Sequence, residues 1–266
     1  MIRKFPSIIK SKGPAVIAIL AIIGLWWTVC AAGWVPRYML PSPPDVVQAL
    51  ISDWSLLWDN AKVTLQEALY GLGIGILIGF GFAVLMDMFD ALYRALYPVM
   101  VISQTIPTVA IAPLLVLWFR YEMKPKIILV VIASFFPIAV GLLDGFKSAD
   151  PDSINLLRSM GAGKWKIFRY LKAPTALPSF FSGLRIATAY SVVTAVISEW
   201  LGGFSGLGVY MTRVKKAYAF DKMFAVIILI SIVSLLLMAL VSILERVCLP
   251  YRHIDEAKDE QAQAAK

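Results

Sequence analysis

The sequence predicts an all-α, polytopic membrane helix bundle with about six transmembrane helices of ~20 residues each. The chain of 266 residues is 59% hydrophobic, only 16% of its residues are charged, and its mean hydropathy is +0.77. The apolar residues gather into long runs, which short polar segments separate. The formal net charge of +8 fits cationic flanks that face anionic lipid, so we expect a lipid bilayer and no nucleic acid as a partner.

The first apolar run, residues 14–34, follows a basic segment at 1–13 and predicts a first span with a cytoplasmic amino terminus. Most of the 25 Lys and Arg fall on the side that this orientation assigns to the cytoplasm. Residues 35–61 then leave the membrane. A stripe that includes Val46, Val47, Leu50 and Ile51 predicts an interfacial amphipathic helix whose aspartates face water.

The second span, residues 62–87, carries glycines at a spacing of four: Gly71, Gly75 and Gly79. Small residues at this spacing let two helix backbones approach closely in a membrane, where lipid supplies no hydrophobic drive for association. We therefore expect a close helix contact here, within the bundle or with a second copy of the chain.

The third span, residues 93–119, is interrupted by Pro98, Pro107 and Pro113. Polar residues surround the middle proline, and we take this group as candidate pathway residues: Gln104, Thr105, Pro107 and Thr108. Broken helices with polar side chains often line transport pathways. For the threonines, repair of backbone hydrogen bonds is an equal alternative; for Gln104 the pathway is favoured, because a whole amide is costly to bury.

A fourth span at 127–143, a fifth at 183–201 and a sixth at 223–247 complete the bundle. Hydroxyl groups share one face of the fifth span, which predicts either a helix contact or a pore wall: Thr188, Ser191, Thr194 and Ser198. Glu199 and Trp200 end this span. An acid near membrane depth is a functional candidate, with pairing to Arg213 or Lys215 as the structural alternative.

A polar, basic stretch at 150–178 separates the fourth and fifth spans. Its apolar residues recur at helical spacing on both sides of Gly161-Ala162-Gly163. Glycine adopts a left-handed conformation at little cost, so Gly161 is well placed to end a helix. The stretch predicts a short helix, a tight turn and a second short helix, after which Pro174 and Pro178 delay the next span.

This stretch resembles the cytoplasmic loop of ABC-importer permeases of the binding-protein-dependent class. Matching residues include Gly161, Ala162 and Phe168, followed by Leu177-Pro178 and Gly183-Leu184-Arg185, whereas the Glu-Ala-Ala of that loop is replaced by Asn155-Leu156-Leu157. The resemblance extends from about Leu40 to Tyr218. It implies the transmembrane domain of a type I (MetI-like) importer, in which 1–61 precede a permease core at 62–247 and 248–266 form a cytoplasmic tail.

The resemblance also implies partners: a second copy of the chain, two ABC ATPase subunits and an external solute-binding protein, at the bacterial inner membrane with both termini cytoplasmic. Cofactors are not expected in this chain, because ATP belongs to the partner ATPase. The residues expected to contact that ATPase are Leu157, Arg158, Met160, Gly161, Ala162, Gly163, Lys164, Trp165 and Phe168. The pathway is expected at Gln104, Thr105, Pro107, Thr108, Ser191, Thr194, Ser198, Glu199 and Trp200.

The substrate expectation comes from one string. Residues 197–211, ISEWLGGFSGLGVYM, are most similar to permeases for pyrimidine precursors of thiamine, with nitrate, sulfonate, taurine or riboflavin-like solutes as alternatives. Tyr190 and Trp200 can stack on a flat ring, although aromatic residues also belt membrane interfaces.

Other function classes lack their residues. The sequence holds no G-x-x-x-x-G-K-[ST] motif, so the chain is not expected to hydrolyse ATP. Cys30 and Cys248 have no metal-site spacing, and the single histidine, His253, offers no catalytic arrangement. An ion-coupled secondary transporter would need charges deep in several spans, and only edge acids such as Asp87 and Glu199 stand out.

Overall fold

The structure is a computed structural model and describes residues 5–250, over which every regular element is a helix. The chain forms two compact units. Unit 1 comprises the chain up to Asn60 together with Tyr210–Leu229, and unit 2 comprises Ala61–Val209 together with the chain from Ile230. The expectations for the first basic residues and for the tail with His253 lie outside the described residues.

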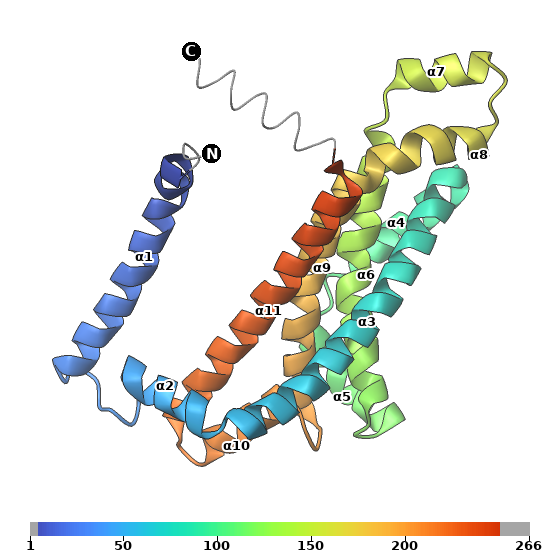
Figure 1. The fold of residues 1–266 in the computed structure, drawn as a ribbon. Coiled ribbons are helices and arrows are strands. Elements are labelled where there is room, and N and C mark those ends of the chain that lie inside the picture. Colours follow the sequence, from blue (N-terminus) through green and yellow to red (C-terminus); the bar gives the residue numbers. More distant parts are fainter. Residues whose placement is uncertain (1–4, 251–266) are drawn as a thin grey trace. The chain divides into compact units, whose positions relative to one another are not determined.

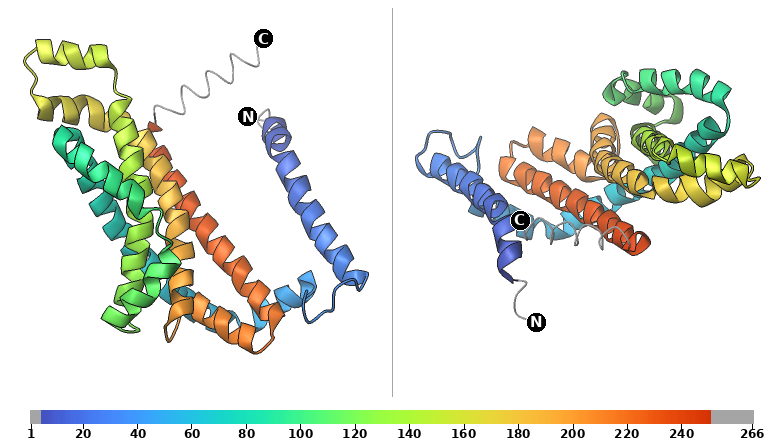
Figure 2. Two further views of the ribbon diagram at one scale, coloured as in Figure 1. Left: turned by 180° about the vertical axis from the view of Figure 1, so that it is seen from behind. Right: turned by 90° about the horizontal axis from the view of Figure 1, so that it is seen from above.

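The helices follow one another in this order: α1 (Phe5–Ala31), α2 (Pro43–Ser52), α3 (Trp54–Met88), α4 (Asp90–Ser103), α5 (Thr108–Phe119), α6 (Met123–Lys147), α7 (Pro151–Ser159), α8 (Lys164–Ile167), the π-helical turn η1 (Phe168–Lys172), α9 (Ala173–Leu201), α10 (Leu207–Lys216) and α11 (Phe220–Cys248). Figures 1 and 2 show them from three directions.

Within the described residues, four helices are long and apolar enough to cross a membrane: α3, α6, the continuous segment Lys164–Leu201, and α11. The third expected span is a pair of helices, α4 and α5, bent by 94° at Gln104–Pro107. Pro98 and Pro113 stay inside their helices, so only the region before Pro107 breaks the span. The first expected span contains a shorter apolar stretch, Val16–Ala31.

Unit 1 is held by aromatic packing and by one half-buried acid. Trp26 of α1 stacks on Phe224 of α11 with ring centroids 5.7 Å apart. Asp53, which directly follows α2, accepts a hydrogen bond from Tyr210 at 2.5 Å and forms an ion pair with Lys222 at 2.8 Å. The expectation that the aspartates of this segment face water is therefore wrong for Asp53. Of the expected stripe, Val46 is buried while Val47 and Ile51 are exposed.

Unit 2 is a bundle in which α6 lies between α3 and α9, with glycine at the contacts (Figure 1). A Cβ atom added at Gly71 or Gly75 would lie within 2.5 Å of Val130 or Ser134 of α6. A Cβ at Gly183 of α9 would lie 2.4 Å from the Pro137 carbonyl oxygen of α6. The predicted close contact of the glycine-rich span is confirmed, and its partner is α6.

The two ends of unit 2 carry different elements. α7 and α8 project from one end, and α5 and the start of α6 lie at the other (Figures 1 and 2). Near the α7–α8 end, Lys172 pairs with Asp87 at 2.6 Å and Arg185 pairs with Glu245 at 3.0 Å. These bonds join the segment that follows α8 to α3 and α11.

The sequence predicted that Pro174 and Pro178 delay the fifth span, and this prediction is wrong. α8, η1 and α9 form one continuous segment, Lys164–Leu201. Pro174 lies in the first turn of α9, where a helix tolerates proline, and the π-helical turn directly before it changes the hydrogen-bond register. The second helix of the predicted helix–turn–helix is therefore the beginning of a membrane span.

A pair of glycine variants tests the α3–α6 contact. A Cβ at Gly79 would lie 2.7 Å from the Phe135 carbonyl oxygen, whereas a Cβ at Gly81 meets nothing within 4 Å. We expect Gly79→Ala to destabilise the bundle by about 1–3 kcal/mol through overpacking. Gly81→Ala is the matched control and should be neutral or slightly stabilising. Equal thermal midpoints for the two purified variants would contradict this packing.

The Asp53 contact predicts a dependence of stability on pH. Burial raises the pKa of Asp53, but hydrogen bonds from Lys222 and Tyr210 outweigh it and hold this pKa below its ordinary 3.8. The contact therefore stabilises the fold above that value and is lost as the pH falls through the lowered pKa. At neutral pH, Asp53→Asn should cost about 1–2 kcal/mol. In thermal unfolding, the difference in midpoint temperature between Asp53→Asn and the unaltered chain should vanish in acid. A difference that stays constant with pH would contradict the assignment.

Candidate functional site

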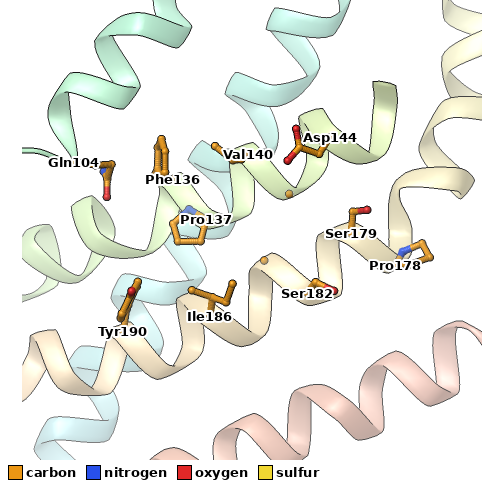
Figure 3. A pocket seen from close by; sticks show the side chains of 12 residues that line it. Gln104, Phe136, Pro137, Val140, Asp144, Pro178, Ser179, Ser182, Ile186 and Tyr190 are labelled. Carbon is orange, nitrogen blue, oxygen red and sulfur yellow. The ribbon is translucent and has the colours of Figure 1, made fainter. Parts of the chain in front are cut away.

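A groove of about 640 Å³ runs along unit 2 between α6, α9 and the break that separates α4 from α5. Figure 3 shows its lining: Gln104, Phe136, Pro137, Val140, Gly141, Asp144, Pro178, Ser179, Ser182, Gly183, Ile186 and Tyr190. Its volume is that of a site for a small organic molecule.

The close approach of α6 and α9 forms the wall of this groove. Gly141 and Gly183 line it, and a Cβ at Gly141 would lie 2.7 Å from the Ser179 carbonyl oxygen. Because no side chain projects from either glycine, the two backbones touch and space remains above them. The same glycines thus hold the helices together and keep the groove open.

The polar groups of the groove lie at both of its ends. Gln104 and Tyr190 lie near one end, and Asp144 and Ser179 near the other (Figure 3). Gln104 directly follows α4, where the chain turns, and it is exposed. Among the described residues that line the groove there is one acid and no base. The groove can therefore donate and accept hydrogen bonds and stack a ring, but it offers no cation to hold an anion.

The expected pathway residues lie in different environments. Gln104 lines the groove, while Thr105 and Pro107 are exposed beside it and Thr108 is half-buried. Ser191, Thr194 and Ser198 are buried on α9 away from the groove.

The hydroxyls of this buried face serve their own helix. Ser191 donates to the Thr188 carbonyl and Ser198 to the Ala195 carbonyl. The face is buried within unit 2, and its role as a pore wall stays a prediction. Glu199 is also buried, with hydrogen bonds from Thr64 and Gly208, and Trp200 is half exposed.

The predicted helix–turn–helix is present as α7 and α8, and Gly161 ends α7 as expected. Gly161 has φ +80, its N–H donates to the Arg158 carbonyl, and the Ala162 N–H donates to the Leu157 carbonyl. This pair of hydrogen bonds is the Schellman arrangement, which closes a helix end in a defined geometry. At the other end of α7, Asp150 accepts from the Ser153 N–H, and hydrogen bonds from Ser153 hold the pKa of Asp150 below its usual value.

The residues expected to meet an ATPase are exposed, with few exceptions. Met160 is 74% exposed and Trp165 is 61% exposed, which is unusual for side chains of this size. Basic side chains surround them, since Arg158 and Lys164 are exposed as well, together with Gly161 and Gly163. Leu157 and Ala162 are half-buried.

Phe168 differs from the rest of this set, because it is buried. Its ring contacts Phe146 of α6 at 5.2 Å and Trp165 at 5.5 Å. Phe168 therefore links the exposed Trp165 to the core of unit 2, rather than offering a free surface.

Sequence reasoning missed two charges inside unit 2. Lys126 Nζ of α6 donates a hydrogen bond to Glu67 Oε1 of α3 at 2.7 Å, and both side chains are buried. The signal was present, since an acid interrupts the second apolar run and a lysine stands at the start of the fourth, but the predicted fourth span began only at residue 127. Among the described residues, no group of three or more His, Cys, Asp or Glu can hold a metal ion.

The sequence matches known transport proteins. The family profile described as "Binding-protein-dependent transport system inner membrane component" matches residues 71–247. A "Formylaminopyrimidine transport permease protein ThiX" from Halalkalibacterium halodurans is 38% identical, over 85% of this chain and 91% of that protein. A "Probable ABC transporter permease protein" from Haemophilus influenzae is 37% identical, over 82% and 91%. Relatives named for riboflavin, taurine and aliphatic sulfonates are 27–30% identical.

The fold also has a solved counterpart. An inward-facing MetNI methionine ABC transporter contains a chain that aligns with a TM-score of 0.66 at 21% identity, covering 73% of this chain and 97% of that one. At this identity the likeness concerns the fold alone.

Proposed function

The chain belongs to the family of binding-protein-dependent transport system inner membrane components, and from this premise we propose how its parts divide the work of import. As an ABC importer permease it is an integral membrane subunit without catalysis of its own, and a separate subunit hydrolyses ATP. In the proposal, the groove between α6 and α9 is this chain's share of the translocation pathway, and α7–α8 is the surface that receives the ATPase.

The observation that carries the proposal is the placement of these two features within one unit. The groove is lined by α9, and α9 continues without interruption through η1 into α8. A displacement of α8 by a partner therefore reaches the groove wall along a single helical segment. Alternating access by rigid-body movement needs such a mechanical link.

The exposed surface of α7–α8 suits a protein partner in the cytoplasm. Large apolar side chains such as Met160 and Trp165 stand among basic ones, and the Schellman turn holds the two helices in one geometry. A preorganised element loses little conformational freedom on docking. We place this end of unit 2, and both termini, in the cytoplasm, in line with the Lys and Arg of the 150–178 stretch.

A second copy of the chain is the simplest partner for the groove. One chain offers a wall lined by α6, α9 and the α4–α5 break, and a closed pathway needs a facing wall. Two identical chains around a two-fold axis, with two ATPases and one external binding protein, supply it.

The proposed solute is a formylaminopyrimidine or a similar neutral pyrimidine. The permease named for that solute is 38% identical, above the relatives named for riboflavin, taurine and sulfonates. The groove agrees with this order, because Tyr190 and Phe136 can stack a flat ring, Gln104 can bond its polar edge, and Asp144 can accept from an amine. Taurine and other sulfonates would meet an acid there and no base.

The coupling role is tested by two glycine variants of one turn. Gly161 has φ +80, where a side chain costs about 1–2 kcal/mol, whereas Gly163 has φ −73 and open space around it. We expect Gly161→Val to insert normally but to lose ATPase binding and uptake, and Gly163→Val to retain more of both. The measurement is co-purification of the ATPase together with ATP-dependent uptake in vesicles. Full ATPase binding by Gly161→Val, or uptake by the chain alone without ATP, would contradict the proposal.

The groove is tested by a second pair. Gln104→Leu removes the amide from the groove, and Thr105→Val alters the exposed neighbour that does not line it. Loss of one hydrogen bond to a neutral solute should lower uptake of formylaminopyrimidine about three- to tenfold in Gln104→Leu, with assembly unchanged. Thr105→Val should transport normally. Unaltered uptake in Gln104→Leu, or faster uptake of taurine than of the pyrimidine by the complete complex, would remove the groove or the solute from the proposal.

A further inference from the structure

Three charged side chains are buried together at the end of unit 2 that lies opposite α7 and α8. They are Glu67 on α3, Lys126 on α6 and Glu199 on α9, and each is 5% exposed or less. None of them lines the groove. Buried charges are costly unless they are paired and fully hydrogen-bonded, so the arrangement of their polar atoms has to account for them.

The hydrogen bonds of Glu199 fix it as an acceptor at both oxygens. Thr64 Oγ1 donates to Oε1 at 2.7 Å, and the Gly208 N–H donates to Oε2 at 2.6 Å. Thr64 Oγ1 itself accepts from the Leu207 N–H at 2.9 Å, which directs its hydroxyl hydrogen to Glu199. The ionised form of Glu199 meets these two donors best, because protonation would weaken one of its two oxygens as an acceptor.

Glu67 has one oxygen satisfied and one not. Lys126 Nζ donates to Oε1 at 2.7 Å, while the buried Oε2 has no hydrogen-bond partner among the described residues. The carboxyl groups of Glu67 and Glu199 are nevertheless within hydrogen-bonding reach of each other. Two carboxylates cannot bond directly, because neither has a hydrogen to donate.

The charges of these three groups do not balance either. The charged groups that meet here are Glu67 from α3, Lys126 from α6 and Glu199 from α9, and the loop that covers them contributes glycines. Two carboxylates and one ammonium leave one uncompensated negative charge in a buried place. A single proton removes that charge and supplies the missing donor.

We propose that Glu67 and Glu199 form a binding site for one proton, which is carried on Glu67 Oε2 and donated to the Glu199 carboxylate, with Lys126 as the counter-charge. In this state the site is neutral and the unsatisfied oxygen becomes a donor. Release of the proton to water leaves two facing carboxylates against one ammonium.

The loop between α9 and α10 packs on these charged groups, so its conformation depends on whether the proton is bound. A Cβ at Gly203 would lie 2.9 Å from Lys126 Nζ, and a Cβ at Gly206 would lie 2.2 Å from the Glu199 carboxyl carbon. Gly206 also has φ +121, which disfavours other residues. The backbone of this loop thus closes directly on the charged groups. Repulsion between two ionised carboxylates would loosen it, so the proton holds the loop closed.

Two isosteric variants with the same change of charge test the assignment in the full-length chain in lipid nanodiscs. In Glu67→Gln the amide oxygen accepts from Lys126 and the amide N–H donates to Glu199, as the protonated acid does. In Glu199→Gln the single amide oxygen can accept from only one of the two donors, Thr64 and the Gly208 N–H. The NH₂ group then opposes the remaining donor. We expect Glu67→Gln to keep the hydrogen-exchange protection of residues 202–208 at all pH values, and Glu199→Gln to lose about tenfold or more of it.

The unaltered chain provides the second measurement, which needs no variant to fold. Its infrared spectrum should contain the carbonyl band of a buried protonated carboxylic acid at neutral pH. This band and the protection of residues 202–208 should disappear together as the pH rises, and the band should be missing in Glu67→Gln.

Absence of the band at neutral pH would overturn the proposal, as would greater loop protection in Glu199→Gln than in Glu67→Gln. Restoration of the closed loop at alkaline pH by sodium ions would also overturn it, since the site would then hold a metal cation. None of these readouts depends on the transported solute or on the ATPase.

Discussion

The direct backbone contact between α6 and α9 is the constraint on which the rest of unit 2 depends. Gly141 and Gly183 allow it, because a Cβ at either position would collide with a carbonyl oxygen of the other helix. In a bilayer, lipid competes with side chains on equal terms, so close packing and small residues must hold helices together. The groove lies along this contact, and α9 leaves it at one end toward α8 and at the other toward Glu199.

The two ends of α9 are stabilised by different means. At one end the chain is held by aromatic packing of Phe168 on Phe146 and by the Lys172–Asp87 ion pair, which leaves α7 and α8 exposed as a preformed surface. At the other end, charged groups are buried beneath a glycine loop. An exposed apolar surface suits a protein partner, whereas a buried polar cluster favours one closed conformation of its loop when every atom is satisfied.

Much of the fold followed from local pattern. The glycine spacing of α3, the helix end at Gly161 and the break near Pro107 depend on properties of single residues or of one helix face, and each was predicted. The course of the chain after Gly163 was not, because the prolines suggested a gap where a π-helical turn keeps the helix continuous. Partners were missed wherever they come from distant segments, as for Glu67 and Lys126.

The sequence alone determined that the chain is a helical membrane protein with a polar, basic stretch between two spans, because hydrophobicity, glycine spacing and helix ends are local properties. The family likeness could be recognised from the same residues. Only the tertiary structure decided that Gln104 joins the groove while Ser191 and Ser198 are covered, and that Glu199 meets Glu67 instead of solvent. Exposure and pairing depend on which helices are neighbours. At membrane depth no water surrounds the helices, so the sequence alone does not distinguish a covered polar side chain from one that lines a groove.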